Sequence, residues 1–464
     1  MNRIGVVRAR LLAAAAAGLV IAGTLAAFAG SAQAAGVLLP SQDPFYDVPA
    51  GISGDANGTI LASRSVTAYF LGLPDLADAW QVKYKSTDNS GNATADVTTI
   101  LVPDLPYVGL GSRPLVSYQT AEDAAGSQCA PSYALESGLQ NVPYMSEASL
   151  TSNSEAETGL IELALARGWA VTVPDYEGPN SDFLGAEGEG AGVLDAIRAT
   201  LAFSATDGIS AATDVAMWGY SGGSFATSIA AQMQPSYAPE LKLTGVALGG
   251  EVANVESTIE SFSGSYLGGA LAMGFASVSR AYPAEDLTQY LNATGVADVA
   301  AAASDCLATA AQQFPELSIA DIANDPDVLT DTPAVSNFLW SISPLGIAGT
   351  PTAPVYDYHS INDEFAPIAP DRQLMDRYCA AGVAVDHLES LASEHISLTV
   401  TGAPGAIAWL EGRFEGLPAP NDCAEIAAPG TPTIGGQAFD GQIPQPGSTI
   451  TGDPDPLLQL LGDL

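Results

Sequence analysis

Short apolar runs recur along the chain, and turn-forming residues bound most of them. Runs of this kind predict buried β-strands, because consecutive apolar side chains can face both sides of a covered sheet. The first two runs flank the turn sequence NSGN and predict a β-hairpin. The predicted strands are Trp80–Asp88, Ala95–Pro103, Arg113–Gln119, Ala170–Asp175, Val215–Tyr220, Leu243–Gly250, Pro354–His359 and Val383–Leu391.

Segments of helical periodicity lie between many of these runs. Ser154–Gly168 begins with a capping residue and ends on a glycine, as helices often do. Gly190–Phe203 and Phe225–Gln234 repeat apolar residues three and four positions apart. A hairpin followed by alternating strands and helices predicts an α/β fold with a mainly parallel sheet.

One connection is too long for this alternation, since residues 251–353 separate two predicted strands. Neighbouring strands normally need only a few residues and one helix between them. The segment is rich in alanine, and its predicted helices are Tyr266–Ser279, Val296–Phe314 and Ile319–Leu329. We therefore expect a helical cap at residues 251–353, inserted into an α/β core made of residues 35–250 and 354–423. Residues 424–464 are rich in Pro and Gly and predict an irregular tail.

Residues 1–34 have the composition of a secretory signal peptide. Three arginines precede an apolar stretch, and Ala32, Gln33 and Ala34 offer a small-residue cleavage site. No two arginines are adjacent, which favours the general secretory route over twin-arginine export. The alternative is an uncleaved N-terminal anchor. No later segment is long and apolar enough to span a bilayer, so we expect a secreted or envelope-associated protein without an integral membrane segment.

The chain is strongly acidic, with 52 Asp and Glu residues against 14 Lys and Arg residues and a formal net charge of −38. Loss of residues 1–34, which contain three arginines and no acidic residue, would change this charge to −41. Such a chain repels nucleic acid and anionic surfaces. Hydrophobic residues make up 47% of it, which is ample for a folded core.

The chain contains four cysteines: Cys129, Cys306, Cys379 and Cys423. An even number in an exported chain favours two disulfides, and three pairings are open on sequence alone. No Cys-x-x-Cys occurs and only three histidines are present, so we expect no structural zinc site. We also expect no metal and no organic cofactor in the chemistry.

The sequence VAMWGYSGGSFATSIA contains the only Gly-x-Ser-x-Gly of the chain, at Gly219, Ser221 and Gly223. A predicted strand leads into this motif and a predicted helix leads out of it. In a strand–turn–helix of this kind, the serine hydroxyl is lifted above the edge of the sheet as a nucleophile. The alternative is a serine in an ordinary glycine-rich turn, and the flanking elements favour the nucleophile.

A nucleophilic serine needs a histidine base, and the base needs an acid that orients it. In α/β-hydrolases the order along the chain is Ser, acid, His, and all three histidines follow Ser221. His395 follows the last predicted strand, where a loop would carry it to the serine, so it is the expected base. His359 is the alternative, although it precedes the best acid. His387 lies within a predicted strand and is expected to be structural.

The expected acid is Asp363, which follows directly after the strand ending at His359. This is the loop after the penultimate predicted strand, where such an acid is expected. Glu364 is the alternative, and Asp357 is predicted to be buried within the strand. A solvated pair of turn residues would be the simplest interpretation if Ser221 and His395 were not in the same chain.

An oxyanion hole needs two preorganised hydrogen-bond donors. One is expected to be the backbone N–H of Gly222, directly after the nucleophile. The second is expected from the loop YQTAEDAAGSQC, residues 118–129. Asp123 is the candidate there, but spacing alone does not single it out from Ala121 or Glu122.

Five stretches together resemble the secretory lipase family of fungi and actinobacteria. The resemblance extends from about Leu39 to Asn421, and the Pro- and Gly-rich tail does not align. The stretches are VSYQTAEDAAGSQCAPSYAL, VTVPDYEGPNSDFLGAEGEGAGVLDAIRA, GYSGGSFAT, GSYLGG and YHSINDEFAPIAPDRQLMDRYCAAG with the later EH.

The resemblance implies an α/β-hydrolase core with an inserted helical cap, and a triad of Ser221, Asp363 and His395. It implies an oxyanion hole formed by Asp123 and Gly222. It also implies that the cysteines pair in sequence order, as Cys129–Cys306 and Cys379–Cys423.

The activity that the resemblance implies is hydrolysis of triacylglycerols and other carboxylic esters through an acyl-enzyme on Ser221. The expected partner is a lipid or ester substrate, with transient contact to a lipid interface. An esterase or acyltransferase that acts on soluble or cell-envelope esters is the first alternative. A non-catalytic lipid-binding envelope protein with the same fold is the second.

Overall fold

The computed structural model describes residues 37–70, 72–109, 111–138, 153–206, 208–426, 433–434 and 437–438. The predicted signal peptide and most of the predicted tail therefore lie outside the described residues. Within the described part of the chain, no helix has both the length and the apolar character needed to cross a membrane.

Nine strands form one sheet in the order β1-β4-β5-β7-β6-β8-β9-β10-β11. Antiparallel pairing joins β1, β4, β5 and β7, and parallel pairing joins the strands from β7 to β11. The strands are β1 (Ile60–Val66), β4 (Ala77–Thr87), β5 (Ala93–Pro103), β6 (Leu115–Gln119), β7 (Ala170–Pro174), β8 (Val215–Tyr220), β9 (Leu243–Gly249), β10 (Val355–Ser360) and β11 (Val385–Ser390). Two small pairs are β2 (Tyr69–Phe70) with β3 (Leu73–Pro74) and β12 (Thr433–Ile434) with β13 (Gln437–Ala438).

The α-helices lie mostly in the connections between these strands. They are α2 (Pro131–Ser137), α3 (Asn153–Ala156), α4 (Thr158–Leu165), α5 (Ala186–Ala202), α6 (Gly222–Tyr237), α7 (Val255–Phe262), α8 (Ala270–Ala281), α9 (Ala293–Ala301), α10 (Leu307–Gln313), α11 (Ile319–Ile322), α12 (Val328–Asp331), α13 (Pro333–Ser341), α14 (Ile368–Ala380), α15 (His395–Phe414) and α16 (Cys423–Ile426). The α/β fold and its mainly parallel sheet are as predicted.

Successive strand residues face opposite sides of the sheet and form two hydrophobic clusters. On one side, Val215, Met217 and Val355 pack with residues of α5, α6 and α14. On the other side, Trp218 and Tyr356 pack with residues of α4 and α15. Because both faces are covered, the central strands are continuous apolar runs, which is why their sequences predicted them. Strand β1 was not predicted, since it is a partly exposed edge strand with polar residues.

Three predicted helices are broken in the structure. Ser154–Gly168 is divided between α3 and α4, and Val296–Phe314 between α9 and α10. In the second case Cys306 has extended backbone and forms an isolated bridge with Ala124, which a continuous helix would prevent. Ile319–Leu329 is divided between α11 and α12 by residues 323–327. This segment contains Pro326, and a proline disfavours helical backbone at the residue before it.

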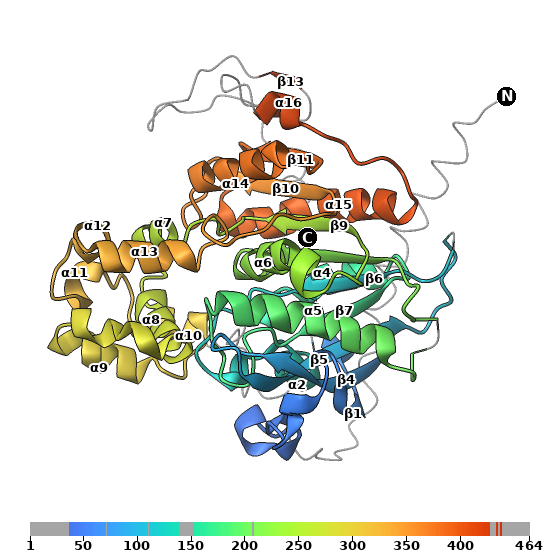
Figure 1. Cartoon of the computed structure of the whole chain (residues 1–464), viewed down its shortest axis with the longest axis horizontal. Helices are drawn as coiled ribbons and strands as arrows, with labels where there is room; N and C mark the ends of the chain where they lie inside the picture. The colour runs from blue at the N-terminus through green and yellow to red at the C-terminus, as the bar shows by residue number, and fades with distance from the viewer. Residues whose placement is uncertain are drawn as a thin grey trace, which may run out of the picture. The chain divides into compact units, whose positions relative to one another are not determined.

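Helices α7 to α13 all lie in the long connection between β9 and β10, and Figure 1 shows them together on one side of the sheet. Their apolar side chains share a cluster with residues of the α/β core. Leu184 and Phe225 from the core contribute to it, together with Val278 and Phe338 from the connection. The connection is thus packed against the core through a hydrophobic interface.

Candidate active site

Ser221 occupies the sharp turn between β8 and α6. Its backbone has φ +53° and ψ −124°, which is rare for a residue with a side chain and marks local strain. Its N–H donates to the carbonyl oxygen of Gly249 at 2.8 Å, which anchors the turn to β9. A Cβ on Gly223 would lie 2.0 Å from the carbonyl oxygen of Gln119, so only glycine allows α6 to start this close to β6.

The structure brings Ser221, His395 and Asp363 together in one hydrogen-bonded chain. His395 Nε2 lies 2.8 Å from Ser221 Oγ, and His395 Nδ1 lies 2.7 Å from Asp363 Oδ2. The three residues follow the carboxyl ends of β8, β10 and β11, which meet at one edge of the parallel sheet. Sequence reasoning placed His395 in a loop, whereas it is the first residue of helix α15.

The position of His395 is fixed from several sides. Its backbone N–H donates to Glu364 Oε2 at 2.9 Å, and its carbonyl oxygen accepts from the hydroxyl of Tyr220 at 2.5 Å. Its ring lies against the rings of Tyr220 and Phe365, with centroid distances of 5.4 and 5.6 Å. Glu364, the alternative acid, therefore holds the backbone of His395 and does not contact its ring nitrogen.

Asp363 is oriented by its own loop. Its Oδ1 accepts the backbone N–H groups of Phe365 at 3.0 Å and Ala366 at 2.6 Å, so Oδ2 faces His395. Burial acts to raise the pKa of Asp363, but the hydrogen bond and charge of His395 outweigh burial and hold this pKa below its usual range. An ionised carboxylate in this place fixes the His395 tautomer whose Nε2 can accept a proton from Ser221.

The other two histidines lie away from Ser221 Oγ. His359 is fully buried, with Nε2 2.7 Å from the carbonyl oxygen of Ala366 and 3.5 Å from Asp363 Oδ2. Burial is the main cause that lowers the pKa of His359. His387 lies in β11 and pairs with Asp357, at 2.5 Å between Nδ1 and Oδ2.

Gly222 and Asp123 lie beside Ser221 and line the same cavity. A Cβ on Gly222 would lie 1.9 Å from Asp123 Oδ1, so the two residues are in close contact. Asp123 has φ +42°, a conformation that aspartate tolerates better than most residues. Ala121 and Glu122 were the alternatives to Asp123 as the second oxyanion donor. Their backbone N–H groups bond elsewhere, to Glu157 at 3.0 Å and to the hydroxyl of Tyr176 at 3.2 Å.

A disulfide between Cys129 and Cys306 ties the loop of Asp123 to the long helical connection. Alongside it, the N–H of Leu307 donates to the carbonyl oxygen of Asp123 at 3.2 Å, and Ala124 forms a β-bridge with Cys306. The loop after β6 and the turn before α10 therefore hold each other in place. No sequence pattern indicated the β-bridge between Ala124 and Cys306.

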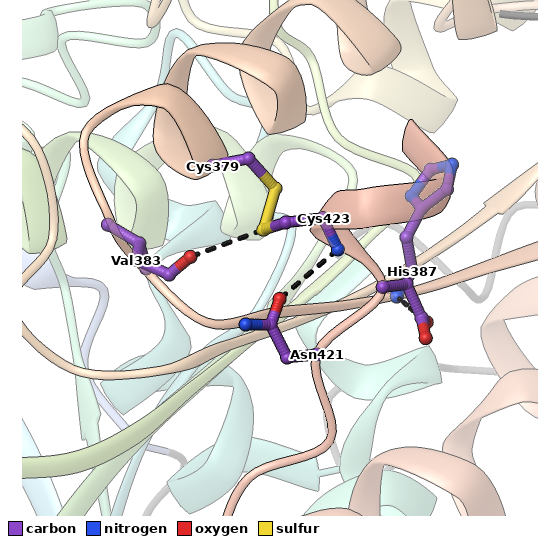
Figure 2. Close-up of a disulfide and its surroundings, with 6 residues drawn as sticks. Cys379, Val383, His387, Asn421 and Cys423 are labelled. Atoms are coloured by element: carbon purple, nitrogen blue, oxygen red, sulfur yellow. Dashed lines mark hydrogen bonds between the residues drawn. A yellow bond between two sulfur atoms is a disulfide. The ribbon is translucent and has the colours of Figure 1, made fainter. Parts of the chain in front are cut away.

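The second disulfide joins Cys379 on α14 to Cys423 at the start of α16 (Figure 2). The N–H of Cys423 donates to Asn421 Oδ1 at 3.1 Å, and the backbone N–H of the neighbouring His387 donates to Asp422 at 3.1 Å. Both disulfides are the pairs that the family resemblance implied. This second pair fixes α14 beside β11, the strand that leads to His395.

A cavity of about 160 Å³ opens beside the Ser221 hydroxyl. Its walls come mainly from α7, α8 and α11 to α13, with Phe183, Leu184 and Phe225 from the core. Apart from Asp123, Ser221, Thr258 and Tyr290, its side chains are apolar. A lining of this kind accepts an aliphatic or aromatic group and places it next to a nucleophile.

A serine on a strand–turn–helix, with a histidine and an aspartate from later strand ends on this sheet, defines an α/β-hydrolase. Solved structures agree with this class. The chain is similar to the X-ray structure of Candida antarctica lipase A, with a TM-score of 0.73 and 26% identity over 85% of this chain and 95% of that chain.

The chain belongs to the secretory lipase family, whose model matches residues 144–422. It is 37% identical to Lipase A of Arthroderma benhamiae, over 83% of this chain and 81% of that protein. It is also 37% identical to a probable inactive lipase of Mycobacterium tuberculosis, over 82% of this chain and 84% of that protein. These relationships make it a lipase or a related ester hydrolase.

Proposed function

We propose that the chain is a secreted serine lipase that hydrolyses triacylglycerols and other carboxylic esters. The observation that carries this proposal is the hydrogen-bonded chain from Ser221 through His395 to Asp363 at an apolar cavity. A lipid ester offers both a carbonyl for the serine and an acyl chain for the cavity.

In the proposed reaction, Ser221 Oγ attacks the ester carbonyl carbon while His395 Nε2 accepts the serine proton. The carbonyl oxygen becomes an oxyanion, which accepts hydrogen bonds from the backbone N–H groups of Gly222 and Asp123. His395 then gives the proton to the leaving alcohol, and the acyl group stays on Ser221. A water molecule, deprotonated by His395, then attacks the acyl carbon. The bond from that carbon to Ser221 Oγ breaks, His395 returns the proton to Ser221 Oγ, and the fatty acid leaves.

Residues 251–353 act in this proposal as a cap that holds the acyl chain, since helices α7 to α13 supply most of the cavity wall. Secretion is proposed from residues 1–34 and agrees with two disulfides, which form in oxidising compartments. N-terminal sequencing of the exported protein should then begin at Ala35. One relative is called a probable inactive lipase. The hydrogen bonds that join Ser221, His395 and Asp363 in this chain support an active enzyme.

The substrate class is tested by comparing an emulsified long-chain triacylglycerol with a soluble short-chain ester. We expect hydrolysis of both, and Gly274→Phe should reduce the rate on the long chain more strongly. Gly274 lines the cavity, and a Cβ there would meet only Phe183, at 3.7 Å. Gly54→Phe, at an exposed position with no neighbour within 4 Å, is the control.

Hydrolysis of the soluble ester alone would favour an esterase or acyltransferase instead of a lipase. No hydrolysis of either substrate by the folded protein would favour the non-catalytic lipid-binding alternative.

A further inference from the structure

A second group of buried titratable side chains lies on the face of the sheet that α14 covers. Asp357 and His359 are two residues apart on β10, so both face the same side as Val355. In the parallel pairing, Asp357 lies beside His387 and His359 beside Glu389. The four side chains therefore form one cluster on the same face of two adjacent strands.

Asp371, in the first turn of α14, adds a carboxylate to this cluster. Oxygen atoms of Asp371 and Asp357 and a ring nitrogen of His387 all lie within 4.8 Å of one another. His359 Nδ1 lies a further 3.7 Å from Asp371 Oδ2. Two carboxylates and two imidazoles thus converge between β10, β11 and α14.

Several of these polar atoms have no hydrogen-bond partner among the described residues. They include both carboxylate oxygens of Asp371, Asp357 Oδ1 and His359 Nδ1, and the side chains of all three residues are fully buried. Burying a carboxylate without partners is costly. A positively charged ligand bound between these atoms would offset this cost.

We propose that Asp357, Asp371 and His387 bind a divalent transition-metal cation, with Zn²⁺ as the best match. Imidazole nitrogen and carboxylate oxygen are ligands that Zn²⁺ prefers, and three or four protein ligands suffice for it. Ca²⁺ needs six to eight oxygen ligands, more than the carboxylates of this cluster supply. This proposal departs from the prediction of no structural zinc site, which rested on the missing cysteine spacing and the small number of histidines.

His387 Nδ1 lies 2.5 Å from Asp357 Oδ2, so a bound cation would replace the proton between these two atoms. Metal-bound histidines usually donate their other ring N–H to a carboxylate or a carbonyl oxygen. His387 Nε2 lies 3.2 Å from Glu389 Oε1, and Arg372 holds Glu389 with two hydrogen bonds of 2.6 and 2.8 Å. His359 Nε2 lies 2.7 Å from the carbonyl oxygen of Ala366, which leaves the lone pair of Nδ1 toward Asp371 as a candidate fourth ligand.

The cation would have a structural role and take no part in the ester chemistry. His359 and Ala366 both touch the loop of the catalytic acid, since the N–H of Ala366 donates to Asp363 Oδ1. A cation between β10, β11 and α14 would therefore brace the base of this loop. The proposal is independent of the proposed function, because it concerns metal uptake and stability.

The experiment uses the full chain, treated with a chelator and then titrated with Zn²⁺ or Ca²⁺ in metal-free buffer. Bound metal is measured by elemental analysis after gel filtration, and Tm by calorimetry. We expect one equivalent of Zn²⁺ and a rise in Tm that saturates at that ratio. Asp371→Asn and His387→Gln should abolish both effects. Asp376→Asn, on the exposed side of the same helix, is the matched control.

Failure of the wild-type chain to retain Zn²⁺ would overturn the proposal. Equal uptake by Asp371→Asn would place the metal elsewhere and overturn it as well. An equal response to Ca²⁺ would contradict the assigned class of cation. Ester hydrolysis, measured on the same samples, reports separately on the proposed function, so a failure of one is distinguishable from a failure of the other.

Discussion

Asp363 and Glu364 are neighbours in sequence, but their carboxylates have different partners. Asp363 meets the ring of His395, whereas Glu364 accepts the backbone N–H of the same residue. Sequence order alone favoured Asp363 without excluding Glu364, because both follow the same strand. The direction of each side chain depends on the N–H groups of Phe365 and Ala366, which no sequence pattern revealed.

Asp363→Asn should lower kcat by a factor of about 10⁴, because the amide favours the wrong tautomer of the histidine. Glu364→Gln should stay close to wild type, since its amide oxygen can still accept the N–H of His395. Initial rates on a soluble ester, with circular dichroism to verify the fold, measure both variants. A larger loss of kcat for Glu364→Gln than for Asp363→Asn would show that Glu364, and not Asp363, is the acid that orients the ring of His395.

Gly222→Ala should lower kcat by a factor of about 10² to 10³, the effect of losing one oxyanion donor. The added methyl group would overlap Asp123 Oδ1 and push the two residues apart. Gly54→Ala, where a Cβ meets nothing within 4 Å, is the control and should keep the wild-type kcat. A Gly222→Ala enzyme with unchanged kcat would exclude this pair as the oxyanion hole.

At the level of elements, the two disulfides should have different effects on activity. Replacing both cysteines of either pair by serine should lower the free energy of unfolding by about 2–5 kcal/mol. Only the change at Cys129 and Cys306 should also lower kcat, because that disulfide holds the loop of Asp123. Urea unfolding and initial rates measure the two effects. Equal loss of kcat in both double variants would show that the loop does not depend on its own disulfide.

The sequence predicted the strands that are fully buried and the helices that show their own apolar periodicity. Buried strands such as β8 are uninterrupted apolar runs, and α6 follows directly from its periodicity. Breaks in the helices of the long connection depend on distant partners, as at Cys306, where a bridge to Ala124 ends the helical pattern. The same holds for the cluster around Asp371, whose members come from three separate elements.

At the scale of the whole molecule, buried carboxyl groups should make stability fall as pH rises. Burial raises the pKa of Glu157 to about 8, despite its hydrogen bonds with Tyr118 and Ala121, and it raises the pKa of Asp175 to about 7. A carboxyl group whose pKa is raised in the folded state contributes its full stability at pH values below its pKa in the unfolded chain, which is near 4.5 for Glu157. That contribution is lost as the pH rises toward the pKa of the group in the folded protein.

The free energy of unfolding should therefore decrease between about pH 5 and 8, by up to about 1.4 kcal/mol per pH unit for each such group. Glu157→Gln cannot ionise and should show a flatter dependence over the same range. Denaturant titrations at a series of pH values measure both proteins. Parallel curves for the wild type and Glu157→Gln would contradict the assignment of this pH dependence to Glu157.

The central claim is that Ser221 is a nucleophile activated by His395. It is tested most directly by treating the folded chain with a fluorophosphonate and locating the adduct by peptide mass spectrometry. We predict one adduct per chain, on the peptide that contains Ser221, and none in Ser221→Ala, whose kcat on esters should fall by about 10⁶. A folded wild-type chain that remains unlabelled, or that carries its adduct on another residue, would contradict the claim.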